Sequence, residues 1–154
     1  MHFDFAMQPI HIFVYGTLKP DENNYFLCVD RVTSCQRAIA HAALYHLPLN
    51  YPTIVPGNAQ TYGYLLTFED QSILEILDEY EQHEPDTIKR FGANNDYQRR
   101  KIEIFDLNGK TLGLAWAYLM TLEQVNRLSG IFVPSGVWSE KKAHSETATS
   151  HPNR

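Results

Sequence analysis

The chain of 154 residues has little cysteine and no long apolar run. Its two cysteines, Cys28 and Cys35, are too few for a disulfide scaffold, and their spacing fits neither a CxxC redox motif nor a zinc knuckle. No segment approaches the roughly 18 uninterrupted apolar residues of a membrane helix. The N-terminus also lacks the basic start and the apolar run of a signal peptide. We therefore expect a cytoplasmic protein with no membrane partner.

Positive charge is also scarce. The formal net charge is −5, and the only basic run comprises Arg99, Arg100 and Lys101. A protein that binds nucleic acid by displacing counterions from phosphates needs a cationic face, so we expect no nucleic-acid partner. The seven histidines show no metal-ligand spacing, and the chain contains no Walker, GxGxxG or GxSxG pattern. We expect no metal site.

The composition that is present is that of a globular protein. With 44% hydrophobic residues, 8 Gly and 8 Pro, the chain is neither wholly disordered nor collagenous. Nine Tyr, eight Phe and two Trp favour strands or a ligand pocket. The length suits a single domain. We assign it to residues 1–138 and expect the polar tail, 139–154, to be disordered.

Strands account for most of the expected elements. An apolar run at 10–15 ends at Gly16 and predicts a strand that is buried on both faces. Two more strands are expected at 38–47 and 59–68, separated by a segment rich in turn-forming residues at 48–58.

The strongest local signal is a hairpin near the middle of the second half. Its strands are expected at 97–106 and 110–120, joined by a type I′ turn at Asn108-Gly109. The segment before it, 83–96, has no periodicity and reads as a loop. We expect that loop to shape the entrance of a pocket.

Two helices complete the expected fold. Asp70 is a natural N-cap for a helix that runs to about residue 82. Thr121 and Gln124 resemble a capping box for a short second helix, which Gly130 stops. Strands dominate and no regular βαβ alternation occurs, so the pattern predicts an α+β domain built on a curved or closed sheet.

The first expected helix carries a carboxylate on its apolar side. At 100° per residue, Ile73, Leu77 and their apolar neighbours form one arc, and Glu81 falls inside it. Asp78 falls on the solvent side, together with Glu75 and Glu79.

Glu81 is therefore a candidate general acid/base. Apolar surroundings disfavour the charged form of a carboxylate and raise its pKa toward neutrality, where it can both accept and return a proton. The alternative is that the helix end frays and Glu81 bends into water or pairs with Arg99 or Arg100.

A second candidate follows the first strand directly. In the sequence Tyr15-Gly16-Thr17-Leu18, the glycine allows a tight turn that points successive backbone N–H groups at one spot. Such an anion nest suits a carboxylate. The alternative is an ordinary turn at the end of a strand.

Taken together, six segments resemble the γ-glutamylcyclotransferase family, also called AIG2-like or BtrG-like. The most specific pair is YGTL at 15–18 and LDEYE at 77–81, because the two occur in the family's order and spacing. The longer matching segments are FVYGTLKPDENNY (13–25), LYHLPLNYPTIVPG (44–57), YGYLLTF (62–68), YQRRKIEIF (97–105) and LAWAYL (114–119).

The resemblance covers residues 10–138 and implies the family's small mixed β-barrel with packed helices and a pocket at one end. It implies an enzyme that releases an amine or amino acid from a γ-glutamyl amide, while the glutamyl part closes on itself as 5-oxoproline. The partner would be a small γ-glutamyl substrate, and no cofactor takes part.

Residue roles carry over by matched motif. Glu81 is similar to the family's catalytic carboxylate, and the segment from Tyr15 to Leu18 is similar to the loop whose backbone holds the γ-glutamyl group. Tyr97 and Tyr118 are similar to aromatic residues near the pocket. The chain departs from the family at Gln82, where Gly often follows the catalytic residue.

Two other functions stay open. A catalytically silent module could keep the pocket and bind a γ-glutamyl or amino-acid-like ligand. An amidohydrolase could use water in place of the substrate amine and release glutamate. The sequence carries no signal for the oligomeric state or for the identity of the amide partner.

Overall fold

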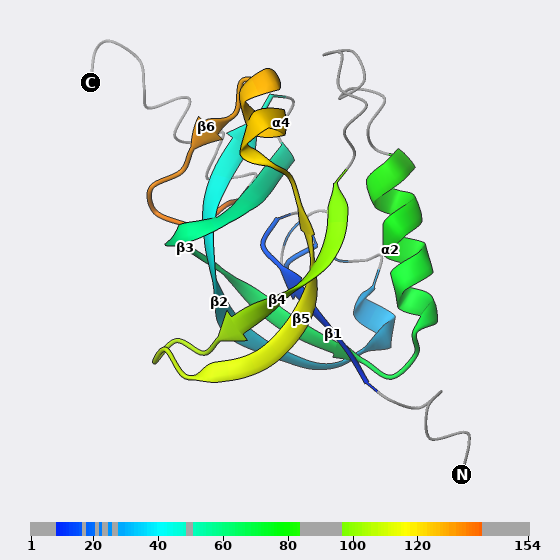
Figure 1. Cartoon of the computed structure of the whole chain (residues 1–154). Coiled ribbons are helices and arrows are strands. Elements are labelled where there is room, and N and C mark those ends of the chain that lie inside the picture. Colours follow the sequence, from blue (N-terminus) through cyan, green and yellow to red (C-terminus); the bar gives the residue numbers. More distant parts are fainter. Residues whose placement is uncertain are drawn as a thin grey trace.

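The computed structural model describes residues 9–16, 18–20, 22, 25, 28–48, 51–83 and 97–139, without the side chains of 79–83. Strands make up most of the described chain, and helices pack against them (Figure 1). In chain order, the elements are β1 (Ile10–Val14), a 3-10 turn (Val29–Arg31), β2 (Val32–Leu47), β3 (Tyr51–Phe68), α2 (Ser72–His83), β4 (Gln98–Phe105), β5 (Thr111–Leu119), α4 (Leu122–Arg127) and β6 (Ile131–Phe132).

The strands form one sheet that closes on itself. Their order is β3-β1-β5-β4-β2-β6, and β3 also pairs with β2, so the path from β3 around to β2 returns to its start. The sheet is mixed because β1 runs parallel to β5 while its pairing with β3 is antiparallel. Figure 1 shows this ring of strands with α2 along its outside and α4 over one end. The predicted α+β class with a small closed sheet is confirmed.

Strands β2 and β3 are longer than the sequence pattern predicts. The segment 48–58 was expected to separate two strands, and this expectation is wrong, because Tyr51–Pro56 pairs with Ala42–Leu47 of β2. A β-bulge between His41 and Ala42 shifts the register and bends the pair. Pairing along a neighbouring strand supplies backbone hydrogen bonds that outweigh the local turn chemistry of Pro and Gly.

The predicted β4–β5 hairpin is present, but its turn is not of type I′. A type I′ turn needs positive φ at both central residues, whereas Gly109 has φ +89° and Asn108 is not among the residues with positive φ. Asp106 explains the difference, because its Oδ1 accepts hydrogen bonds from the backbone N–H groups of Asn108 and Lys110, each at 2.9 Å. Such side-chain bonds stabilise a longer loop with glycine in the left-handed position.

The core has three parts. The largest lies inside the ring and includes Phe13, Leu44, Ile54 and Trp138. A second lies between the ring and α2, and a third lies under α4. Neighbouring residues of β5 therefore face different clusters: Ala117 and Leu119 face inward, whereas Tyr118 faces α2.

Both helices are capped as the sequence predicts. The Asp70 carboxylate accepts from the Ser72 N–H at 2.9 Å, and this bond holds the pKa of Asp70 below its usual value. Thr121 and Gln124 form a complete capping box on α4. The left-handed residue after α4 is Ser129 rather than Gly130, at φ 61°.

Two further expectations concern segments that lie largely outside the described residues. The predicted disordered tail, 139–154, lies outside the described residues except for Ser139, as do 84–96 of the predicted loop. None of the helices in the described part of the chain is long and apolar enough to cross a membrane.

Candidate functional site

The turn after β1 is buried and tightly packed. Gly16 and Leu18 are both buried, whereas Thr17 lies outside the described residues. A Cβ at Gly16 would stand 2.5 Å from Cγ of Pro52, so the glycine is required by this close approach rather than by a left-handed φ. Within the described residues, the backbone N–H groups of Gly16 and Leu18 donate to no backbone carbonyl. The anion nest itself stays a prediction, because Thr17 at its centre lies outside the described residues.

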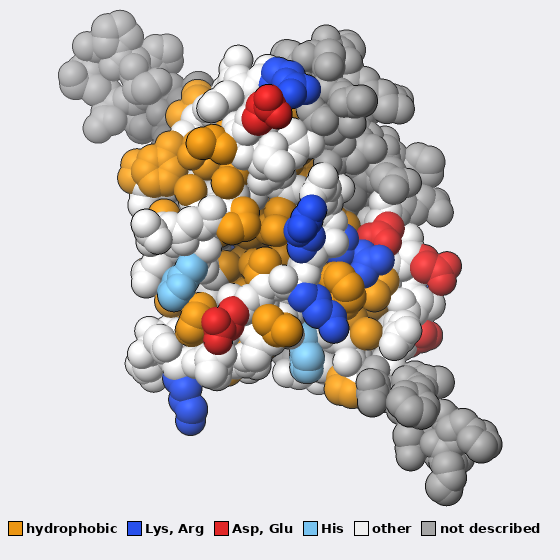
Figure 2. All heavy atoms as spheres, viewed as in Figure 1, with side chains coloured by type: hydrophobic (Ala, Val, Ile, Leu, Met, Phe, Trp, Pro, Cys, Tyr) orange, Lys and Arg blue, Asp and Glu red, His pale blue; other side chains and the backbone are white. Residues whose placement is uncertain are grey.

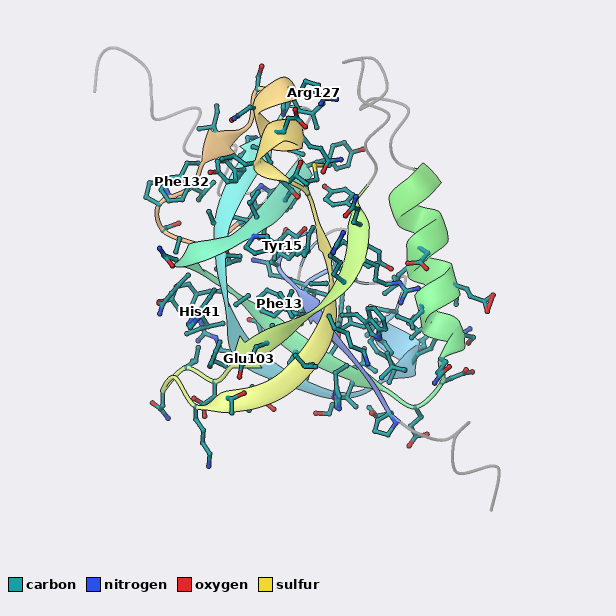
Figure 3. All side chains as sticks on the ribbon, viewed as in Figure 1. Phe13, Tyr15, His41, Glu103, Arg127 and Phe132 are labelled. Atoms are coloured by element: carbon teal, nitrogen blue, oxygen red, sulfur yellow. The ribbon has the colours of Figure 1, made fainter. Side chains whose placement is uncertain are left out.

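Tyr15 connects this turn to strand β5. Its ring stacks with Phe13 inside the core at 6.2 Å between centroids, and Figure 3 shows both side chains inside the ring of strands. The Tyr15 hydroxyl donates to the backbone carbonyl of Tyr118. Two of the sequence-predicted site residues, far apart in the chain, are thus in direct contact.

Lys19 is a buried cation on the same turn. It is only 7% exposed, and its Nζ donates to the carbonyl of Trp138. The Lys19 N–H donates to the Gly16 carbonyl at 3.0 Å, which places the Lys19 backbone beside the segment where the nest is predicted. Sequence reasoning did not single out Lys19, because a lysine in a turn is normally solvated. A positive charge here favours an anionic ligand.

Pro52 is the second residue that sequence reasoning missed. Its ring packs on Gly16, and its carbonyl accepts from the Tyr97 hydroxyl at 2.6 Å. Tyr97 is therefore hydrogen-bonded to β3, the strand whose Pro52 packs on Gly16. In the sequence, the one feature that points to Pro52 is its position inside the segment 44–57, which resembles the family.

Helix α2 lies against the outside of the ring on its predicted apolar face. Ile73 and Leu77 are completely buried, and Glu75 is exposed as expected. The backbone of Glu81 belongs to this helix. Its side chain lies outside the described residues, so the expectation that Glu81 is largely buried stays a prediction.

The expected solvent position of Asp78 is wrong. Its side chain is 34% exposed and accepts three hydrogen bonds from the sheet. Arg99 Nε and Nη2 donate to the two carboxylate oxygens at 2.8 and 3.0 Å, and the Tyr118 hydroxyl donates at 2.6 Å. The helical wheel failed because it treats everything outside the apolar arc as water, whereas here that side faces β4 and β5.

Arg99 and Arg100, from the basic run in β4, interact with other side chains of the protein. Arg99 pairs with Asp78 and lies over the ring of Trp116 at 4.5 Å, and Arg100 donates to Gln98. On the face of the molecule shown in Figure 2, positively charged side chains lie over the strands and negatively charged ones gather on the side where α2 lies. The side chain of Glu81 lies outside the described residues, so the alternative that it pairs with Arg99 or Arg100 stays open.

The thiols and histidines offer no competing chemistry in the described chain. Both cysteines are free, and burial together with the charge of Cys35 raises the pKa of Cys28 to about 11. Burial also raises the pKa of Cys35. Neither thiol is activated as a nucleophile. Within the described residues, no group of His, Cys, Asp and Glu is arranged to hold a metal ion.

The fold recurs in solved structures. YkqA from Bacillus subtilis is 21% identical with a TM-score of 0.62; the alignment covers 94% of this chain and 44% of YkqA. An AIG2-like protein from Mus musculus is 20% identical with a TM-score of 0.63, and the alignment covers 86% of this chain and 89% of the mouse protein. An Arabidopsis thaliana protein is 21% identical with a TM-score of 0.57, at 93% and 77% coverage.

These identities establish a shared fold. No curated protein matched the sequence. A sequence model of the family described as "Gamma-glutamyl cyclotransferase, AIG2-like" matches residues 12–140, which include both the YGTL turn and the LDEYE segment of α2. The chain therefore belongs to the AIG2-like γ-glutamyl cyclotransferase family.

Proposed function

We propose that the protein is a γ-glutamylcyclotransferase that converts a small γ-glutamyl amide into 5-oxoproline and a free amine or amino acid. The observation that carries the proposal is the family match over 12–140, which spans both motif segments. Available backbone donors at Gly16 and Leu18, with the buried charge of Lys19 beside them, support binding of an anionic group. The α-carboxylate of the glutamyl unit is such a group.

In the proposed reaction, Glu81 carries protons in both directions. The substrate α-ammonium loses a proton to the Glu81 carboxylate, and the resulting amine attacks the γ-carbonyl carbon. The new C–N bond closes a five-membered ring, and the bond to the departing nitrogen breaks. That nitrogen takes up a proton and leaves as an amine, so one acid/base group serves both half-steps.

The rest of the site has to hold the glutamyl chain in a folded conformation, with its α-amine close to its γ-carbonyl carbon. Ring closure is intramolecular, so most of the barrier reduction comes from bringing the amine against the carbonyl and from stabilising the developing oxyanion. Anchoring the α-carboxylate at Gly16 to Leu18 fixes one end of the glutamyl chain. No cofactor is required for this chemistry.

The test is turnover of defined γ-glutamyl compounds by the wild type and by Glu81→Gln. γ-Glutamyl-alanine, glutathione and Nε-(γ-glutamyl)-lysine represent three kinds of leaving amine. We expect the wild type to release 5-oxoproline from at least one, and Glu81→Gln to lose at least about 10²-fold of that activity while keeping its fold. Glu75→Gln, an exposed carboxylate of the same helix, is the matched control and should match the wild type.

Product identity separates the remaining functions. Free glutamate in place of 5-oxoproline would identify an amidohydrolase. Binding detected by calorimetry without any turnover would identify a silent ligand-binding module. Equal turnover by Glu81→Gln and the wild type would end the acid/base assignment.

A further inference from the structure

One carboxylate holds helix α2 to the sheet through directional contacts. Asp78 accepts two hydrogen bonds from the Arg99 guanidinium and one from the Tyr118 hydroxyl. The ion pair is partly buried, with side-chain exposures of 27% for Arg99 and 34% for Asp78. Paired N–H donors that meet both oxygens of a carboxylate fix orientation as well as distance.

The two residues that donate to Asp78 are neighbours on the sheet. Arg99 and Tyr118 are direct partners across the β4–β5 pair, so both side chains leave the sheet on the same face. The Arg99 guanidinium also lies over the Trp116 ring, with Cζ 4.5 Å from the ring centroid, and this cation–π contact supports its position. Among the described side chains of α2, the fully buried ones, Ile73 and Leu77, make apolar and therefore non-directional contacts. Within the described part of α2, Asp78 therefore supplies the directional contacts with β4 and β5.

Tyr118 also contacts Tyr15, which begins the turn after β1 in the candidate site. While its hydroxyl donates to Asp78 on the α2 side, its backbone carbonyl accepts from the Tyr15 hydroxyl on the inner side. The same residue thus contacts the helix that carries Glu81 and the turn that carries the nest. Its hydroxyl is engaged by the protein, which argues against direct substrate binding through that group.

We propose that Asp78, Arg99 and Tyr118 are positioning residues that hold Glu81 in place relative to the turn from Tyr15 to Leu18. Asp78 precedes Glu81 by three residues, so fixing Asp78 fixes the helical turn from which Glu81 projects. The inference rests on the proposed function. A displacement of about 1 Å in a reacting group can lower a rate about 100-fold.

The experiment measures kcat and KM for 5-oxoproline release by the wild type, Tyr118→Phe and Arg99→Lys. Tyr118→Phe removes only the hydroxyl and keeps the ring and the carbonyl, and Arg99→Lys keeps the charge but cannot form the two-point pair. Tyr62→Phe is the matched control, because within the described residues the Tyr62 hydroxyl donates only to the exposed Gln60 side chain, at 3.2 Å. Circular dichroism and thermal melting verify that each variant folds.

We expect Tyr118→Phe and Arg99→Lys to lower kcat about 10–100-fold with KM within about threefold of the wild type, and Tyr62→Phe to change neither. In a Glu81→Gln background, Tyr118→Phe should lower the residual rate by less than about twofold, because its effect acts through Glu81.

Contrary results are distinguishable. Three results would each overturn the positioning role and leave the proposed function standing. The first is a wild-type kcat in both Tyr118→Phe and Arg99→Lys, and the second is a change in KM without a change in kcat. The third is a fall in kcat on Tyr118→Phe that is as large in the Glu81→Gln background as in the wild type. Absence of 5-oxoproline from the wild type would overturn both.

Discussion

Two threonines of β3 are completely buried but differ in their hydrogen bonding. The Thr61 hydroxyl donates to the carbonyl of Ala42 at 2.9 Å, next to the register shift between β2 and β3. The Thr53 hydroxyl oxygen has no hydrogen-bond partner among the described residues. A buried polar group without a partner keeps its desolvation cost, whereas a bonded one offsets it.

Replacing each threonine by valine should therefore change stability in opposite directions. Thr61→Val leaves the Ala42 carbonyl unsatisfied and should lower the free energy of unfolding by about 1–3 kcal/mol. Thr53→Val removes an unsatisfied hydroxyl and should leave stability unchanged or raise it by up to about 1 kcal/mol. Urea unfolding with comparable m-values measures both. A Thr53→Val loss as large as that of Thr61→Val would show that the Thr53 hydroxyl has a partner.

The contact between β1 and β3 has no room for a side chain at Gly63. A Cβ there would stand 2.2 Å from the Val14 carbonyl oxygen, which belongs to rigid strand backbone. Val14 ends β1 and directly precedes Tyr15, so strain at this contact is transmitted to the turn that carries the nest. Gly57, in the same strand β3, has its nearest neighbour, the Val55 carbonyl oxygen, at 3.9 Å.

Gly63→Ala should lower the free energy of unfolding by about 1–3 kcal/mol through overpacking. Gly57→Ala is the control and should stay within about 0.5 kcal/mol of the wild type. Chemical denaturation of the two variants checks the difference. Equal stability of both variants would mean that β1 can move away from β3 at little cost.

The last part of the described chain ties separate regions of the fold together. Trp138 is buried inside the ring, and its carbonyl accepts from Lys19. Its indole N–H donates to His46 of β2 at 3.0 Å. Just before it, the Gly136 carbonyl accepts from the Tyr62 N–H of β3 at 2.7 Å. The nest turn, β2 and β3 are all joined through this segment.

Trp138→Ala should therefore destabilise the entire domain by about 3–5 kcal/mol. Phe132→Ala is the matched control: this aromatic residue is 46% exposed and lies at the rim (Figure 3), so its loss should cost less than about 1 kcal/mol. Deletion of 140–154 should leave the melting temperature unchanged, as the polar composition of that segment suggests. A large drop on deletion would show that the segment packs on the domain.

Much of this molecule could be predicted from local patterns alone. The strand in the apolar run at 10–15, the arc of Ile73 and Leu77, the pairing of the two hairpin strands and the capping box on Thr121 all form as predicted. Each depends on residues that are neighbours in the sequence, so propensity, periodicity and capping chemistry suffice. The motif pair YGTL and LDEYE likewise identified the family before any contact was known.

The position of Asp78 could in part have been anticipated. A hairpin centred on Asn108-Gly109 places Arg99 opposite Tyr118, and the observed register agrees even though the turn type differs. A cation and a phenol side by side on one sheet face would attract a carboxylate from any helix packed there. The missing information was which face of the sheet α2 covers.

The sequence by itself determined where most of the strands and the two helices lie, and the residue types from which the candidate site is made. Only the tertiary structure decided that 51–56 continues a strand, that Lys19 is buried, and that Tyr118 touches both Tyr15 and Asp78. The physical reason is that the first fact depends on pairing with the neighbouring strand β2, and the other two depend on contacts between residues 40 to 119 positions apart. Whether a charged group is solvated or paired is set by the surface that packs against it, and that surface comes from elsewhere in the chain.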